Sequence, residues 1–251
     1  MDRHALTEPL GRLAGLGLAP ITAAVSALRR ARTFHPEGVV VRGRVEPIAG
    51  GAWPRIASAL AGHALVRLST ALFRRGAWPD VLGCAVRFTR EVPDGVAARD
   101  DDQDLLLATI RRPWTMGFAP FTTDVTDHLA NDLFGVCPFR VEEGVVEWRL
   151  SPEQRSPAGS DRTARLEAAM RAGAAHLVLG VRRWPGVLVV GDRPPFEPVV
   201  RLSLIERLDV DQDALRFDPH RAGRGVVPTG FVHGLRVAAY AASQRARPRG
   251  R

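Results

Sequence analysis

The 251 residues suffice to bury one full hydrophobic core, and a hydrophobic content of 45% excludes an intrinsically disordered chain. The formal net charge is +8, and all 35 basic residues are arginine. A basic surface attracts nucleic acid or anionic lipid, but these arginines are spread along the chain and aromatic residues are not interleaved with them. We therefore expect no specific nucleic-acid binding.

The start of the chain is apolar. Residues 13–28 resemble the core of a signal peptide, but Pro20, several glycines and the acidic Asp2 and Glu8 argue against a secretory signal. The stretch is also too short and too interrupted to span a bilayer. We expect an N-terminal helical arm at 1–30 that packs on the body of the protein or makes peripheral contact with a membrane surface.

Most of the remaining chain has the pattern of β-strands. Alternating or continuous apolar runs predict strands, and an acidic loop precedes the fourth of them. A hairpin is expected at 137–151, turning at Glu143-Gly144. The expected strands lie at 38–48, at 63–69 within the apolar stretch 57–70, at 79–91, in the later part of 96–110 after the acidic loop, at 175–184 and at 199–210.

Three segments have helical spacing. Residues 122–135 begin with a Thr/Asp cap, and 160–173 is capped by Ser160 or Asp161 and closed by Gly173. The tail, 230–251, is expected to form a basic helix. Because the strands come first and the helices late, the natural class is antiparallel α+β.

The two cysteines, Cys84 and Cys137, are far apart, and each lies inside an apolar run. Their spacing matches no metal-ligand motif. They are expected to be small core residues in a reducing compartment, so we expect a cytoplasmic protein.

Tyr240 is the single tyrosine, and Arg236 stands one helical turn before it. This spacing lets the guanidinium reach the phenol oxygen and stabilise its anion, and a tyrosine phenolate is one axial ligand of haem iron. His35 precedes a strand and, taken alone, is better explained as a residue of a solvated turn than as a catalytic histidine. The pair Arg236 and Tyr240 is by itself a weak signal, since any arginine-rich helix can contain it.

Five blocks of the sequence resemble, in order, blocks of the haem-binding catalases. Residues 216–240 resemble the segment in which F-[DN]-P is followed by P-G-[IV]-x-P-[ST] and R-x-x-x-Y. The other four are R-x-x-H at 32–35, VRLST at 66–70, PDVLGCAVRF at 79–88 and DQDLLLATI at 102–110. The chain is far shorter than a full catalase, and it resembles the small, barrel-only members of the family. That likeness implies that 31–251 form an antiparallel catalase-like β-barrel with surrounding helices and a C-terminal haem-ligand helix.

The resemblance implies haem b as the cofactor, and it implies which residues lie on the distal and proximal sides of the iron. His35 matches the distal histidine, and Ser69 matches the serine that hydrogen-bonds its imidazole. Tyr240 matches the proximal iron ligand, and Arg236 the arginine that keeps it anionic.

The resemblance also implies cationic partners for the two haem propionates. Arg32 and Arg67 match two arginines that bind propionates in the family. A third such arginine follows the tyrosine by seven residues, which points to Arg247, with Arg245 as the near alternative.

Two positions depart from the family pattern. Ala108 stands where catalases carry the distal asparagine; Thr109, the next residue, could replace its hydrogen bond. Phe34 stands where relatives similar to allene oxide synthase carry threonine.

We therefore expect a haem-dependent oxidoreductase that uses hydrogen peroxide or an organic hydroperoxide with an organic electron donor, with weak catalase activity. The alternatives are a haem-binding protein with little turnover and a hydroperoxide-rearranging enzyme, and a homo-oligomer is compatible with the sequence.

Overall fold

The computed structural model describes residues 37–71, 78–112, 115–184, 186 and 193–230. The helices are α2 (Pro54–Leu60), α3 (Ala119–Thr122) and α4 (Arg162–Arg171), with a 3-10 turn η2 (His128–Ala130). The strands are β1 (Glu37–Pro47), β2 (Gly62–Thr70), β3 (Leu82–Thr89), β4 (Gln103–Ala108), β5 (Leu133–Gly135), β6 (Phe139–Val141), β7 (Gly144–Pro152), β8 (His176–Arg183), β9 (Glu197–Arg207) and β10 (Val227–Pro228).

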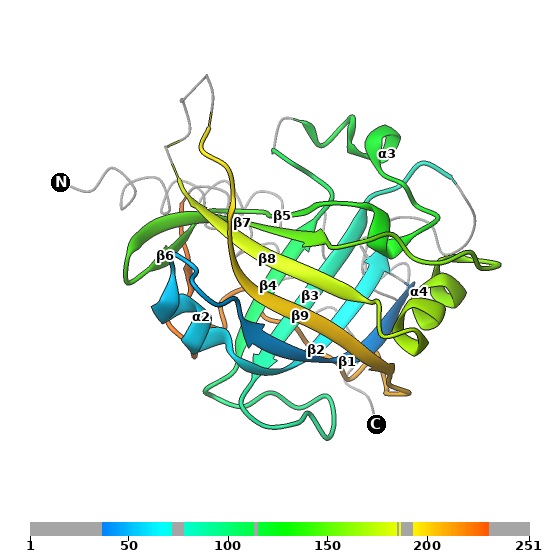
Figure 1. Cartoon of the computed structure of the whole chain (residues 1–251), viewed down its shortest axis with the longest axis horizontal. Coiled ribbons are helices and arrows are strands. Elements are labelled where there is room, and N and C mark those ends of the chain that lie inside the picture. Colours follow the sequence, from blue (N-terminus) through cyan, green and yellow to red (C-terminus); the bar gives the residue numbers. More distant parts are fainter. Residues whose placement is uncertain (1–36, 72–77, 113–114, 185, 187–192, 231–251) are drawn as a thin grey trace, which may run out of the picture.

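Eight of these strands close into an antiparallel barrel (Figure 1). Neighbouring strands follow the order β7-β5-β4-β3-β2-β1-β9-β8, and a pairing between β7 and β8 closes the ring. Strands β6 and β10 extend the sheet beyond β7. The closed ring leaves those eight strands without a free edge, and it confirms the expected antiparallel β-barrel.

The interior of the barrel holds the main hydrophobic core. Each strand contributes alternate residues, as Ala64, Val66 and Leu68 do from β2. Helix α2 adds Ile56 and Leu60, and helix α4 adds Leu166 and Ala169. Figure 1 shows these two helices at separate places on the barrel wall.

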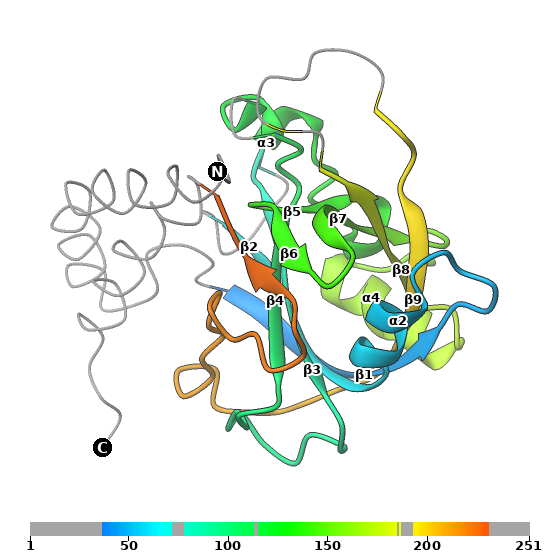
Figure 2. The same cartoon turned by 90° about the vertical axis from the view of Figure 1, so that its left-hand side faces the viewer.

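A second, smaller cluster lies on the outer face of β1 to β4. Val40 and Leu65 point outward there, and Leu215 and Phe217 from the segment after β9 pack on them. This part of the outer face is therefore covered by the segment that follows β9. Figure 2 shows the segment that follows β9 running along this side of β1 to β4.

The expected strands are largely confirmed. Apolar alternation placed β1, β3, β4, β8 and β9 within a few residues of their observed bounds. In the stretch 57–70, the first residues belong to helix α2 and the strand begins at Gly62. The hairpin also forms: Val141 of β6 pairs with Gly144 of β7, and Gly144 has a positive φ of 127° that suits glycine.

The helix expected at 122–135 is wrong. The segment contains only the 3-10 turn η2 followed by strand β5. Asp127 accepts a hydrogen bond from the Leu129 backbone N–H, and the Asn131 side chain bonds the Asp124 backbone. These side chains satisfy the backbone locally and so compete with helix formation, while β5 gains partners in β4 and β7.

Helix α4 is confirmed within 160–173, with Asp161 as its cap. The Asp161 carboxylate accepts hydrogen bonds from the backbone N–H groups of Thr163 and Ala164, both at 2.9 Å. Gly173 follows the helix with φ of 63°, the left-handed conformation of a helix end.

The expected arm at 1–30, its boundary with the barrel and the expected basic helix at 230–251 lie outside the described residues, except for Gly230. Among the helices that the structure describes, none is long and apolar enough to cross a bilayer.

Candidate functional site

The candidate site lies on the outer face of β2, where Arg67 and Ser69 are two residues apart. Residues with this spacing share a face of a strand, and the intervening Leu68 belongs to the interior core. Both side chains are buried, each residue with 4% of its surface exposed. The structure thus brings together two of the residues singled out in the sequence.

A strip of small residues crosses four strands at the level of Ser69. The register pairs Gly38 of β1 with Ser69, Ser69 with Gly83 of β3, and Gly83 with Ala108 of β4. Residues directly opposite one another in an antiparallel pair present their side chains on the same face. Small residues therefore lie side by side on the outer face of four adjacent strands.

Arg67 is held beside this strip. Its Nε donates to Gln212 Oε1 at 3.2 Å, and Gln212 Nε2 donates to the Gly38 carbonyl at 2.7 Å. A Cβ at Gly38 would come within 2.9 Å of the Arg67 guanidinium carbon. It would also come within 2.7 Å of the Leu68 carbonyl oxygen, so this close packing favours glycine at 38.

Two rows away on the same face, Arg87 and Asp104 form a buried ion pair. Arg87 Nε donates to Asp104 Oδ1 at 2.9 Å, and both side chains are at most 1% exposed. Arg221 Nε adds a second cation at 3.2 Å from Asp104 Oδ2. Burial raises the pKa of the Asp104 carboxyl, and this effect exceeds the opposing effect of the two arginines.

This ion pair fastens the 216–226 segment, which contains the catalase-like F-D-P sequence, to the barrel. The Asp218 backbone N–H donates to Asp104 Oδ2 at 2.8 Å, and the Arg87 guanidinium carbon lies 5.1 Å from the centre of the Phe217 ring. Gln103 also donates to the carbonyls of Arg221 and Val226. These contacts fix the position of the chain shortly before residue 230. They therefore also fix where the segment that carries Arg236 and Tyr240 begins.

Ala108 and Thr109 have different surroundings. Ala108 shares the strip with Ser69 through Gly83, and it packs on Ala119 of α3. Thr109 follows the end of β4, and its hydroxyl accepts a hydrogen bond from the Leu82 backbone N–H at 3.2 Å and lies 2.8 Å from the Thr123 hydroxyl. Its hydroxyl is therefore already engaged within the protein.

The remaining site residues expected from the sequence lie outside the described residues: Arg32, His35, Arg236, Tyr240, Arg245 and Arg247. Within the described ranges, no three His, Cys, Asp or Glu side chains gather in a way that could hold a metal ion. Cys84 and Cys137 are both buried, and both belong to the interior core, as expected. The residues expected on the two sides of the haem iron thus stay a prediction.

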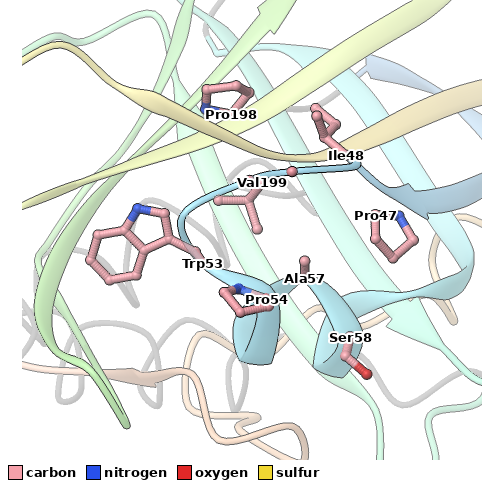
Figure 3. Close-up of a pocket in the computed structure, with 10 residues that line it drawn as sticks. Pro47, Ile48, Trp53, Pro54, Ala57, Ser58, Pro198 and Val199 are labelled. Atoms are coloured by element: carbon pink, nitrogen blue, oxygen red, sulfur yellow. The ribbon is translucent and has the colours of Figure 1, made fainter.

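A hollow of about 150 Å³ lies at the other end of β1 (Figure 3). Trp53 and Pro54 of the α2 turn face Pro198 and Val199 of β9 across it. The Trp53 ring N–H donates to Glu197 at 2.8 Å. Since Pro47 stands nine positions after Gly38 along β1, the hollow is about 30 Å from the small-residue strip, and it has no part in the candidate site.

Sequence reasoning missed the residues that support Arg67. Gln212 lies in a loop with no motif of its own, and its role depends on a contact across 145 residues. Gly83 and Arg87 stand in the catalase-like block 79–88, but their roles follow only from the strand register. The sequence shows which residues this block contains, but not which residues of the neighbouring strands lie opposite them.

No protein-family model and no curated protein matches this chain. Among solved structures, nine chains match, one of them described as a bacterial catalase. That catalase is 14% identical, with a TM-score of 0.57 over 86% of this chain and 57% of its own length. The present chain therefore spans little more than half of it. At this identity the likeness concerns the fold: the chain has a catalase-like antiparallel β-barrel.

Proposed function

We propose that this chain is a haem-dependent oxidoreductase that uses hydrogen peroxide or an organic hydroperoxide, with peroxidase-like activity above catalase activity. Its cofactor is haem b. The observation that carries the proposal is the juxtaposition of Arg67 and Ser69, buried on one outer face of a catalase-like barrel, beside a strip of small residues.

The chemistry of these residues fits a haem. The Arg67 guanidinium is a fork of donors suited to a carboxylate, such as a propionate, and Gln212 and Gly38 hold it in place. Gly38, Ser69, Gly83 and Ala108 bring small residues together on the outer face beside Arg67, and we propose that the macrocycle packs on this side of the sheet. Arg32 and either Arg245 or Arg247 are proposed as further propionate partners.

The bound cofactor would supply the redox-active iron that accepts and returns electrons. Tyr240 is proposed as the iron ligand, and Arg236 lowers the pKa of its phenol by stabilising the anion. His35 takes a proton from one oxygen of the peroxide and delivers it to the other, so that water can leave. The Ser69 hydroxyl orients the imidazole for this transfer.

Ala108 favours donor oxidation over rapid peroxide dismutation. It lies in the same strip as Ser69, and its methyl group offers no hydrogen bond to a peroxide held over that strip. Two alternatives share the fold: a haem carrier with little turnover, and an enzyme that rearranges organic hydroperoxides. Phe34, where relatives similar to allene oxide synthase carry threonine, weighs against the second.

Peroxide-driven oxidation of a dye tests the proposal. Haemin-loaded protein should oxidise the dye, and His35→Ala should keep its haem and lose about a hundredfold to ten-thousandfold in rate. His220→Ala, at an exposed position, is the matched control and should retain the wild-type rate. Haem-loaded protein without turnover would favour the carrier, and full activity in His35→Ala would show that another group moves the proton.

A further inference from the structure

The loop around α3 presents large apolar side chains to the solvent. Met116 is 56% exposed, Phe118 72% and Phe121 77%, all within six residues of chain. Together with Trp78, which is 70% exposed, they make up four of the seven large hydrophobic side chains exposed in the described part of the protein. We call Met116, Phe118 and Phe121 the apolar loop. Such a concentration of exposed apolar side chains is typical of a surface that binds a membrane or another protein.

The apolar loop is anchored from beneath. Ala119, between the two phenylalanines, is 3% exposed and packs against Ala71, Val81 and Ala108. Trp78 belongs to the segment that leads into Val81, so it reaches the same end of the barrel. Figure 2 shows α3 beyond the strand ends. The outward direction of the phenylalanines therefore follows from the packing of their neighbour.

The threonine hydroxyls of the loop are hydrogen bonded to its own backbone. The Thr115 hydroxyl donates to the Arg112 carbonyl and accepts from the Arg112 backbone N–H. The hydroxyls of Thr122 and Thr123 both donate to the Ala119 carbonyl. A segment that enters the apolar edge of a bilayer must satisfy its backbone groups in this way, because lipid offers no partners.

The charge around the loop is complementary to an anionic surface. From residue 105 to residue 123 the chain contains no acidic residue, and Arg111 at the base of the loop is exposed. Asp80, near Trp78, is only 1% exposed, and its carboxylate accepts a hydrogen bond from the Val81 backbone N–H. Aromatic side chains with arginine beside them are the combination that lies at the headgroup level of anionic membranes.

We propose that the apolar loop docks this protein onto the surface of an anionic lipid bilayer, with Phe118 and Phe121 inserted among the acyl chains. This surface is separate in sequence from the apolar start of the chain. The proposal does not depend on haem binding or on turnover.

Co-sedimentation with vesicles tests it, using the full chain. Wild type should bind vesicles of equimolar phosphatidylcholine and phosphatidylglycerol more strongly than phosphatidylcholine alone. Phe118→Ser/Phe121→Ser should weaken binding to the mixed vesicles by about tenfold or more, since two large apolar groups no longer leave water. Ile205→Ser/Val227→Ser removes two exposed apolar side chains elsewhere, 49% and 45% exposed, and should bind like wild type.

A fluorescent label reports insertion directly. In Phe118→Cys, an environment-sensitive dye on the new thiol should shift to the blue when mixed vesicles are added. The native Cys84 should not compete for the dye, because burial raises the pKa of its thiol to about 12. Vesicle binding that is equal in wild type and Phe118→Ser/Phe121→Ser, or a label that stays in water, would overturn the proposal. So would a loss of self-association in the double variant without any vesicle binding by wild type, which would assign the loop to a second copy of the chain.

Discussion

The guanidinium of Arg67 and the side-chain amide of Gln212 are hydrogen bonded at 3.2 Å although 145 residues separate them in sequence. The same amide bonds the Gly38 carbonyl, so one side chain ties the arginine to the first strand of the barrel. A long, flexible arginine side chain is thereby fixed before any ligand arrives. Such preorganisation lowers the entropy cost of binding a carboxylate.

Gln212→Leu should therefore weaken haemin binding without removing it. The loss of one hydrogen bond is worth about 1 kcal/mol, or roughly fivefold in affinity. Arg67→Leu should weaken binding more, because it removes the cation itself. Haemin titration followed by absorbance measures both, and Gln154→Leu, which removes an exposed glutamine bonded to the Ala174 carbonyl, is the control. Equal haemin affinity in Gln212→Leu and wild type would rule out the positioning role.

Asp104→Asn should destabilise the fold by about 3–5 kcal/mol, because it leaves the guanidinium of Arg87 buried without its counter-charge. The double change Arg87→Leu/Asp104→Leu should cost less than the sum of the single changes, since neither charge is then stranded. Urea unfolding measures the free energy of unfolding. Glu142→Gln, which breaks an exposed ion pair with Arg55, should cost only about 0–1 kcal/mol. Similar losses in Asp104→Asn and Glu142→Gln would contradict this account.

Lowering the pH should destabilise the protein through His128. Burial, and to a lesser extent the charge of Arg162, lowers the pKa of His128 from 6.5 to about 4. Above pH 6.5 the ring is neutral in both states; as the pH falls towards 4, the unfolded chain binds a proton that the folded chain does not, so stability is lost.

Removing this ring should flatten the pH dependence. The free energy of unfolding of His128→Leu, measured by urea titration at several pH values, should fall less steeply across that window than that of wild type. The exposed His220→Gln should keep the wild-type slope. Identical slopes in all three proteins would mean that His128 does not titrate abnormally.

Ala108→Asn should shift the balance of activities. A distal amide adds one hydrogen bond to bound peroxide, about 1 kcal/mol, so oxygen evolution should rise several-fold relative to donor oxidation. Both rates can be measured on samples with the same haem content. If wild type evolves oxygen far faster than it oxidises any donor, Ala108 does not favour donor oxidation as proposed.

The sequence predicted the parts of the fold that depend on local patterns. Alternation in 38–48 gives β1, and the cap at Asp161 together with Gly173 gives α4. Helix α2 was missed because its N-cap, Trp53, makes no side-chain capping bond. The helix expected at 122–135 failed because Asp127 and Asn131 bond the backbone and tertiary pairing recruits β5.

The candidate site was less accessible from the sequence. The motif at 66–70 identified Arg67 and Ser69, and the structure confirms that they share a buried face. The strip that pairs Ser69 with Gly38 and Gly83 depends on strand register, which no single segment encodes. The contact of Gln212 with Arg67 depends on how a long loop crosses the sheet, which is decided by the assembled barrel.

The visible spectrum of the purified protein after addition of haemin tests the central claim most directly. The account predicts a stoichiometric complex with the absorption bands of high-spin ferric haem, and Tyr240→Phe should lose most of the haem or shift those bands to another ligand. Arg236→Ala should change the spectrum less, by raising the phenol pKa and weakening the iron bond at neutral pH. Protein that stays colourless and takes up no haemin would contradict the account, as would a Tyr240→Phe spectrum identical to that of wild type.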